Sequence, residues 1–497
     1  MDIIAKGVLM KRILTAFFAV VILAVALYLV IRIPKPGLSE NHKTEAPVTA
    51  STSTEEWLGM YIHDQRVGYS FTKIIKNDNG LVVENRSQMT IFMMQEVRTL
   101  STYFFAHTNA DYTLKDFSLE IFTTGHPTKI EGKIEDKTMI LTSYSQGIPQ
   151  TKSIVLEDRP FFPDALEEII KDKNLKPGDE LTIPYFDPTT QSQSPAKIRI
   201  LDAEPVQVLN RQVTGTKVQV DFMGIATFLW LDENYRLLKE SSPNLGLEMI
   251  PLSKEDALAE IKPDQAFDLL SYFSVKLDKP IPGFQKLSYI KLELDSIEIG
   301  ELELNGDYQV LVSRAPIIIE AYYPDLDSLP DLMTPIHDQK DFLRSSVYIQ
   351  SDHPDIIAEA KRIVGHEKNA KKMAEQLVNG VNTMLEKRPT PSLPSALDVL
   401  KTREGDCNEH AILFTALARA LGIPCKIYVG LVNLYGNAYY YHAWCAVWLG
   451  KWVAVDPTFG QFPADLYHLK LKEGEISEQA KVLTVVGKLK ITVLEYR

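Results

Sequence analysis

The most informative stretch of this 497-residue chain lies between residues 405 and 424 and reads GDCNEHAILFTALARALGIP. A run of good helix formers begins at Cys407, and the Gly-Ile-Pro that closes the stretch is a typical helix stop. Asp406 has an N-cap side chain, and Glu409 three residues later completes a capping-box pattern. The sequence therefore predicts a helix whose first residue is Cys407.

This position suits a reactive thiol. Unpaired backbone N–H groups and the helix macrodipole stabilise an anion at a helix N-terminus, so a thiolate is favoured there. The helix is apolar nearly all round, which predicts that it is buried and holds its first residue rigidly. We expect Cys407 to be a nucleophile, and Cys425 and Cys445, the other two cysteines, to be small buried hydrophobes.

The residues after this helix predict strands over 426–432, 439–449 and 452–455. His442 is near the start of the second strand, and Asp456 directly follows the third. A two-residue turn at 450–451 places His442 on the wrong face of the sheet, whereas a three-residue turn at 449–451 makes His442 and Asp456 diagonal neighbours. A Cys407–His442–Asp456 triad therefore requires the three-residue turn.

The residue types match the roles of a cysteine nucleophile site. Cys407 attacks, His442 accepts and returns the proton, and Asp456 orients the imidazole. N–H groups at the helix start are candidates for part of an oxyanion hole. His410 is a rival base on the same helix, and Trp444 is a candidate substrate-binding residue beside the site.

Four motifs follow one another in this region: GDC at 405–407, RALGIP at 419–424, HAW at 442–444 and WVAVDPT at 452–458. Together they resemble the core of the transglutaminase-like superfamily, over about residues 352–462. The resemblance implies a papain-like α+β fold with Cys407, His442 and Asp456 at the triad positions. It also implies a thioester formed from a glutamine amide or a peptide bond and passed to an amine or to water. Which acceptor is used stays open, and no acidic calcium loop is present.

The N-terminal region predicts membrane attachment. Residues 13–31 carry no charge and span about 28 Å as a helix, close to the hydrocarbon thickness of a bilayer. We expect an uncleaved single-pass anchor, with a cleaved signal peptide as the alternative. Lys6, Lys11 and Arg12 precede the span, which predicts a cytoplasmic N-terminus and an extracytoplasmic bulk, periplasmic or at the cell surface.

The rest of the chain divides by its hydrophobic period. Residues 57–312 alternate with period two and carry frequent turn signals, which predicts antiparallel sheets, whereas helical stripes begin near residue 352. The expected fold class is α+β. The expected segments are a cytoplasmic stub and anchor (1–33), a flexible tether (34–55), a β-rich accessory domain (56–255), a second β-rich segment (256–345) and the catalytic domain (346–497).

Composition excludes other classes of function. A net charge of −12 and the lack of a dense Lys/Arg run argue against a nucleic-acid partner. The ten scattered histidines show no metal-binding spacing, so no metal or cofactor is expected. We expect a membrane-anchored, extracytoplasmic cysteine enzyme, a hydrolase or transferase acting on peptide or protein amides. The alternative is a catalytically silent binding or scaffolding protein of the cell envelope.

Overall fold

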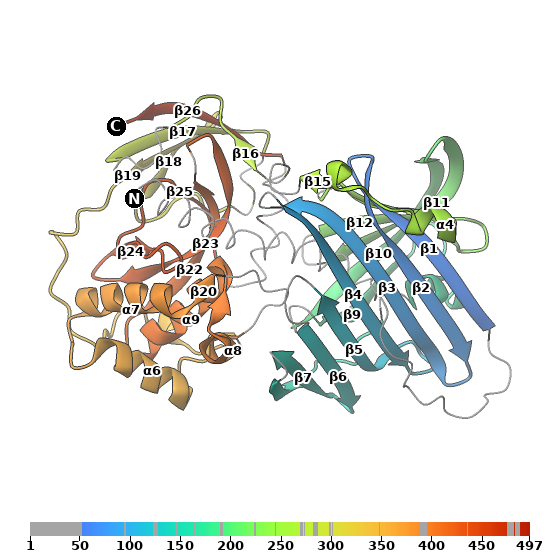
Figure 1. Ribbon diagram of the computed structural model, residues 1–497, viewed down its shortest axis with the longest axis horizontal. Coiled ribbons are helices and arrows are strands. Elements are labelled where there is room, and N and C mark those ends of the chain that lie inside the picture. The colour runs from blue at the N-terminus through green and yellow to red at the C-terminus, as the bar shows by residue number, and fades with distance from the viewer. Residues whose placement is uncertain are drawn as a thin grey trace. The chain divides into compact units, whose positions relative to one another are not determined.

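The computed structural model describes residues 52–497, apart from 94–95, 123–127, 146–147, 163–164, 189–191, 223–224, 244, 269–271, 273, 282–286, 298–299, 301, 347, 388–394, 435, 475–481 and 483–487. The described residues form two compact units, one within residues 52–269 and one within residues 270–497. Figure 1 shows the first unit as blue to green strands and the second as yellow to red helices and strands.

The first unit is built on one 15-stranded sheet. Strands β1 to β8 form one antiparallel meander and β9 to β14 another, and β1 pairs with β14 to join them. The short β15 adds to β3 in parallel. The strands are β1 (Thr52–Ile62), β2 (Gln65–Asn77), β3 (Gly80–Met93), β4 (Glu96–Thr108), β5 (Leu114–Phe122), β6 (Thr128–Glu135), β7 (Thr138–Ser145), β8 (Ile148–Val155), β9 (Glu180–Asp187), β10 (Ser192–Val208), β11 (Arg211–Phe222), β12 (Ile225–Leu231), β13 (Leu237–Ser242), β14 (Leu247–Pro251) and β15 (Phe267–Asp268). The helices are α3 (Leu166–Asp172), α4 (Lys254–Leu258) and the 3₁₀ turn η2 (Pro263–Gln265).

The second unit combines helices with two antiparallel sheets, ordered β16-β23-β22-β25 with β24 beside β23, and β18-β19-β17-β26. Its strands are β16 (Val275–Lys276), β17 (Tyr289–Asp295), β18 (Gln309–Arg314), β19 (Ile317–Tyr322), β20 (Glu386–Lys387), β21 (Glu404–Gly405), β22 (Cys425–Asn433), β23 (Ala438–Trp448), β24 (Trp452–Val455), β25 (His468–Glu473) and β26 (Lys490–Tyr496). Its helices are α6 (Pro354–Val364), α7 (Ala370–Met384), α8 (Ala396–Thr402), α9 (Cys407–Ala420) and the 3₁₀ turn η3 (Lys340–Leu343).

Helix α9 is the centre of the second unit. It contacts α6, α7 and α8 and packs on β22 and β23, and Figure 1 shows these helices gathered on one side of that sheet. Twelve of its residues are buried, because its side chains are apolar on nearly every face. The first residue of α9 is therefore held by a rigid support.

The second sheet is linked to β25 of the first sheet by one side chain. Gln309, at the start of β18, donates to the Lys470 carbonyl at 2.8 Å and accepts from the Lys470 N–H at 2.9 Å.

The expected fold class, α+β with an N-terminal membrane helix, is wrong. Of the described residues, 53% are in strands and 18% in helices, because period-two alternation continues through most of the chain and builds large antiparallel sheets. The expected single-pass membrane localisation is likewise not supported. No helix among the described residues is long and apolar enough to cross a bilayer, and the predicted span at 13–31 lies outside these residues.

Candidate active site

Residues at the start of α9 hold Cys407 in place through the capping box that the sequence predicts. The Asp406 carboxylate accepts from the Asn408 N–H at 3.0 Å and also caps the N–H of Glu409. In return, the Glu409 carboxylate accepts from the Asp406 N–H at 2.8 Å. These bonds satisfy donors that have no partner inside the helix, so the helix begins at a defined residue.

The hairpin between β23 and β24 has the three-residue turn that a triad requires. Trp448 pairs with Trp452, and the Leu449 N–H donates to the Lys451 carbonyl at 2.9 Å. With this register, His442 Nε2 lies 2.7 Å from Asp456 Oδ2. The structure therefore brings these two predicted residues into direct contact.

Asp456 opens a tight loop that fixes its carboxylate. Backbone N–H groups of Asp456 and Gln461 donate to each other's carbonyls at 2.9 Å. Oδ1 of Asp456 accepts from the N–H groups of Thr458 at 2.6 Å and Phe459 at 3.0 Å. Burial opposes its ionisation, but the neighbouring His442 and a second histidine, His468, hold the pKa of Asp456 well below its usual range. The carboxylate is therefore ionised and immobile.

His442 is oriented by this carboxylate. A carboxylate only accepts hydrogen bonds, so Nε2 of His442 carries the proton and Nδ1 is left with a free lone pair in the neutral ring. Phe459 stacks on the imidazole, with ring centroids 4.7 Å apart and planes 3° apart. Burial lowers the pKa of His442 despite the nearby Asp456. A neutral imidazole with an available Nδ1 has the form of a general base.

The Cys407 thiol lies beside the same strand and interacts with the backbone N–H of Ala443, the residue after His442. Burial, and next the charge of Asp406, raise the pKa of Cys407 well above its ordinary value. This is opposite to the effect expected from the helix N-terminus, because Cys407 is 0% exposed and its nearest charges are negative. Both pKa shifts favour the neutral forms, a thiol at Cys407 and an uncharged imidazole at His442.

His410 and Trp444 are placed differently from Cys407, His442 and Asp456. Nδ1 of His410 lies 2.6 Å from the Asp406 carbonyl, and its Nε2 has no partner among the described residues. Burial lowers the pKa of His410 to about 4. Trp444 is fully buried, and its ring lies 5.9 Å from that of His442 at 14°. Trp444 thus packs against the imidazole ring of His442.

Cys425 and Cys445 are buried beneath α9. Each thiol lies 3.5 Å from the Thr415 hydroxyl, and the Cys445 thiol also donates to the Ala411 carbonyl at 3.4 Å. Their side chains therefore pack against the middle of the helix, away from its first residue.

One residue of the site was missed in the sequence. His468, the first residue of β25, places Nε2 3.0 Å from Asp456 Oδ2. No spacing motif links His468 to Asp456; the only signal is a histidine at the head of an alternating strand pattern. The two meet because β25 pairs with β22 beside β23.

His442, Asp456 and His468 each present a possible metal ligand, and these atoms lie within 4.8 Å of one another. The hydrogen bonds of 2.7 and 3.0 Å to one carboxylate oxygen already account for this spacing. No metal is needed to explain the arrangement.

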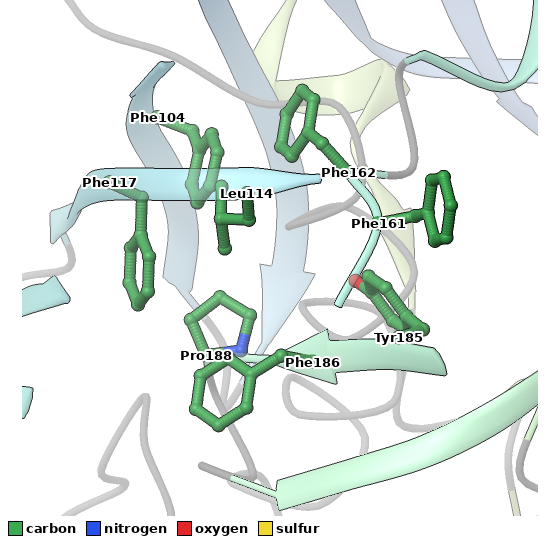
Figure 2. Close-up of a pocket in the computed structure, with 8 residues that line it drawn as sticks. All are labelled: Phe104, Leu114, Phe117, Phe161, Phe162, Tyr185, Phe186 and Pro188. Atoms are coloured by element: carbon green, nitrogen blue, oxygen red, sulfur yellow. The ribbon is translucent and has the colours of Figure 1, made fainter. Parts of the chain in front are cut away.

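The first unit has a small pocket of a different character, shown in Figure 2. Aromatic rings dominate its lining, including Phe104, Phe117, Phe161, Phe162, Tyr185 and Phe186. Phe104 stacks on Phe117 and Phe162 with centroids 5.7 and 5.4 Å apart. The lining has no carboxylate, histidine or thiol, so the pocket holds none of the groups that the triad chemistry needs.

One comparison with known proteins, the family match, agrees with the motifs. Residues 357–457 match the profile of the Transglutaminase-like superfamily, whereas no curated protein matches the chain. Similar solved structures include a candidate cysteine protease from Cytophaga hutchinsonii, with 17% identity, a TM-score of 0.31 and coverage of 43% of this chain and 89% of that one. A domain of unknown function from Brucella abortus has 11% identity and a TM-score of 0.30, covering 40% of this chain and 95% of that one. Another candidate protease, from Parabacteroides distasonis, has 12% identity and a TM-score of 0.19, covering 66% of this chain and 63% of that one. The family match alone places a transglutaminase-like core at residues 357–457 of this chain.

Proposed function

We propose that the second unit is a cysteine enzyme in which Cys407 forms an acyl-enzyme with a peptide or protein amide. The observation that carries this proposal is the 2.7 Å contact between His442 Nε2 and Asp456 Oδ2. It fixes the tautomer that leaves Nδ1 as a proton acceptor, while the Cys407 thiol lies at the N–H of the next residue, Ala443.

The proposed reaction has two halves. His442 Nδ1 takes the thiol proton as sulfur attacks the amide carbon. When the tetrahedral intermediate collapses, the same proton passes to the leaving amine, and a thioester remains on Cys407. Water or a primary amine then attacks the thioester and gives a proton to His442. His442 returns this proton to the Cys407 sulfur as the product is released. Asp456 keeps the ring in place throughout and stabilises the imidazolium that forms in each half.

The test uses the full chain with a mixture of glutamine-containing peptides and a biotinylated primary amine in H₂¹⁸O. Mass spectrometry distinguishes ¹⁸O in a new carboxylate, which reports hydrolysis, from the amine adduct, which reports transfer. We expect one of these products from the unaltered protein and none from Cys407→Ala. Cys445→Ala is the matched control, because it removes a buried thiol that bonds to Thr415 and Ala411 in the middle of α9, and it should retain the product.

Product formation that survives Cys407→Ala would reject the proposal. Folded, unaltered protein that forms neither product and no thioester would instead favour the scaffolding alternative.

A further inference from the structure

His468 shares the Asp456 carboxylate with His442. Asp456 Oδ2 lies 2.7 Å from His442 Nε2 and 3.0 Å from His468 Nε2. On the other side of its ring, His468 Nδ1 lies 2.9 Å from Asp465 Oδ1 and 3.2 Å from the Asp465 carbonyl. His468 is therefore held between two carboxylates, and its side chain is fully buried.

These contacts determine the protonation of His468. Every oxygen that faces its ring is a carboxylate or carbonyl oxygen, which can only accept a hydrogen bond. Both ring nitrogens must therefore donate, and a histidine with two N–H groups is an imidazolium. Burial by itself would lower the pKa of His468, but Asp456 and Asp465 together raise it to about 10, in agreement with the geometry.

Asp465 is itself held in position to face His468. The Asp465 N–H donates to the Gln461 amide oxygen at 3.1 Å, and the Gln461 amide nitrogen donates to Asp465 Oδ2 at 2.8 Å. Gln461 also closes the loop that begins at Asp456. The two carboxylates on either side of His468 are thus fixed by the same short segment.

Asp456 has no free accepting position. Its Oδ1 receives two backbone N–H groups, and its Oδ2 receives the two histidines. If His468 were absent, the charge of Asp456 would act on His442 without the cation that shares its Oδ2. An uncompensated carboxylate favours the protonated form of a neighbouring histidine, which would remove the lone pair needed for proton transfer.

We propose that His468 is a positioning residue whose fixed positive charge offsets Asp456 and keeps His442 neutral and ready to accept the Cys407 proton. The role given to His442 here rests on the proposed function. The charge state of the two histidines does not, and it can be measured without a substrate.

Other charged groups also influence the pKa of His442. The shift expected from the loss of His468 must be larger than any change in their influence. Charged or titratable groups that face the site from neighbouring elements are Asp406 at the N-cap of α9, Cys407, Glu409 and His410 on α9, Lys387 on β20, Cys445 on β23, and Asp465 before β25. Of these groups, Asp465 is hydrogen-bonded to the His468 ring, and all of them are kept in His468→Gln, so the loss of the His468 charge is the main difference.

The test is an NMR titration of ¹⁵N-histidine-labelled full chain, with His442 and His468 assigned from His442→Gln and His468→Gln. In the unaltered protein we expect His468 to keep both ring protons past pH 9, while His442 stays neutral near pH 7. The two ring centroids are 5.5 Å apart, so His468→Gln should raise the midpoint of His442 by about one to two pH units.

His107→Gln is the matched control. His107 contacts Asp116 at 2.6 Å and the ring of Phe105 in the first unit, so its replacement should leave His442 unchanged. If His468→Gln does not fold, Asp465→Asn provides the second test, because it removes one of the two carboxylates and should lower the midpoint of His468.

A His468 that titrates near pH 6.5 in the unaltered protein would overturn the proposal, as would an unmoved His442 in folded His468→Gln. These titration results do not depend on whether the protein has the proposed activity. Inactivity toward peptides with the expected titrations would reject the enzyme and leave the charge arrangement standing.

Discussion

The Cys407 thiol has two opposing influences at the scale of single residues. The N-terminus of α9 favours a thiolate, but burial and the charges of Asp406, Glu409 and Asp456 raise its pKa. Burial also lowers the pKa of His442. Because each shift favours the neutral form, the proton should leave Cys407 only when a substrate is attacked.

Asp406→Asn tests this balance. Asparagine retains the N-cap hydrogen bond. It removes the negative charge that, after burial, does most to raise the pKa of Cys407. We expect alkylation of Cys407 by iodoacetamide to rise with pH along a curve displaced above 8.5 in the unaltered protein, and to become about three- to tenfold faster at pH 8 in the variant. Mass spectrometry of the alkylated peptide gives the rate. An unaltered Cys407 that alkylates fully as thiolate at pH 7 would contradict this expectation.

Asp456→Asn tests the orientation of His442. An asparagine amide can present N–H to the ring and so stabilise the wrong tautomer, with Nδ1 protonated. We expect the rate of product formation to fall about 10³-fold or more, measured with the peptide and amine assay. Asp116→Asn is the control, since it alters a comparable His–Asp contact in the first unit. A loss of less than tenfold for Asp456→Asn would argue against this role.

The sequence could predict the residue types of the site but not all of its members. A local helix cap predicts Cys407 as a candidate, and their places on consecutive strands predict His442 and Asp456. The position of His468 beside Asp456 depends on the pairing of β25 with β22. This pairing includes a register shift between Val429 and Gly430. A contact of this kind depends on a non-local bulge that no local spacing encodes.

At the scale of elements, the capping box of α9 was predictable, whereas the length of the hairpin turn was not. The cap is a pattern of adjacent residues. The turn had two possible lengths in the sequence, and the structure has the longer one, with Gly450 in the left-handed region at φ +86°. This difference of one residue in turn length determines which side chains face each other across β23 and β24.

Gly405→Ala tests how strongly the start of α9 is fixed. A Cβ at residue 405 would lie 2.2 Å from Glu409 Cβ and 2.6 Å from its Cγ, so the capping box must shift. We expect the free energy of unfolding to fall by about 2–4 kcal/mol, measured by denaturant titration of the full chain. Glu409→Gln keeps an oxygen that can accept from Asp406 and should cost less than half as much. Equal losses for the two variants would show that the clash has no special effect.

At the scale of the whole molecule, the alternating pattern predicted antiparallel sheets but not their extent. Two meanders join through β1 and β14 into one sheet, and that long-range pair has no signature in either strand. The domain boundaries drawn from the sequence stay predictions. We propose a boundary near residue 270, because β17 pairs with β26 and β16 with β23.

Fragments of the chain test this boundary. A fragment of residues 270–497 should unfold cooperatively, whereas a fragment of residues 346–497 lacks β16 to β19, exposes the edge of β26 and removes Gln309 from Lys470. We expect the shorter fragment to aggregate or to lose cooperative unfolding, as followed by circular dichroism and light scattering. Equal stability of the two fragments would place the boundary nearer residue 346.

The pairing of β17 with β26 also has a consequence for biosynthesis. The two strands are about 200 residues apart in the chain, so the second unit cannot close its sheet until residue 496 has left the ribosome. At common translation speeds this is roughly 10–50 s after residue 269. During this interval the first unit can already be folded, while β17 lacks the partner strand that β26 supplies. Chaperones that protect exposed sheet edges would therefore act mainly on the second half of the nascent chain.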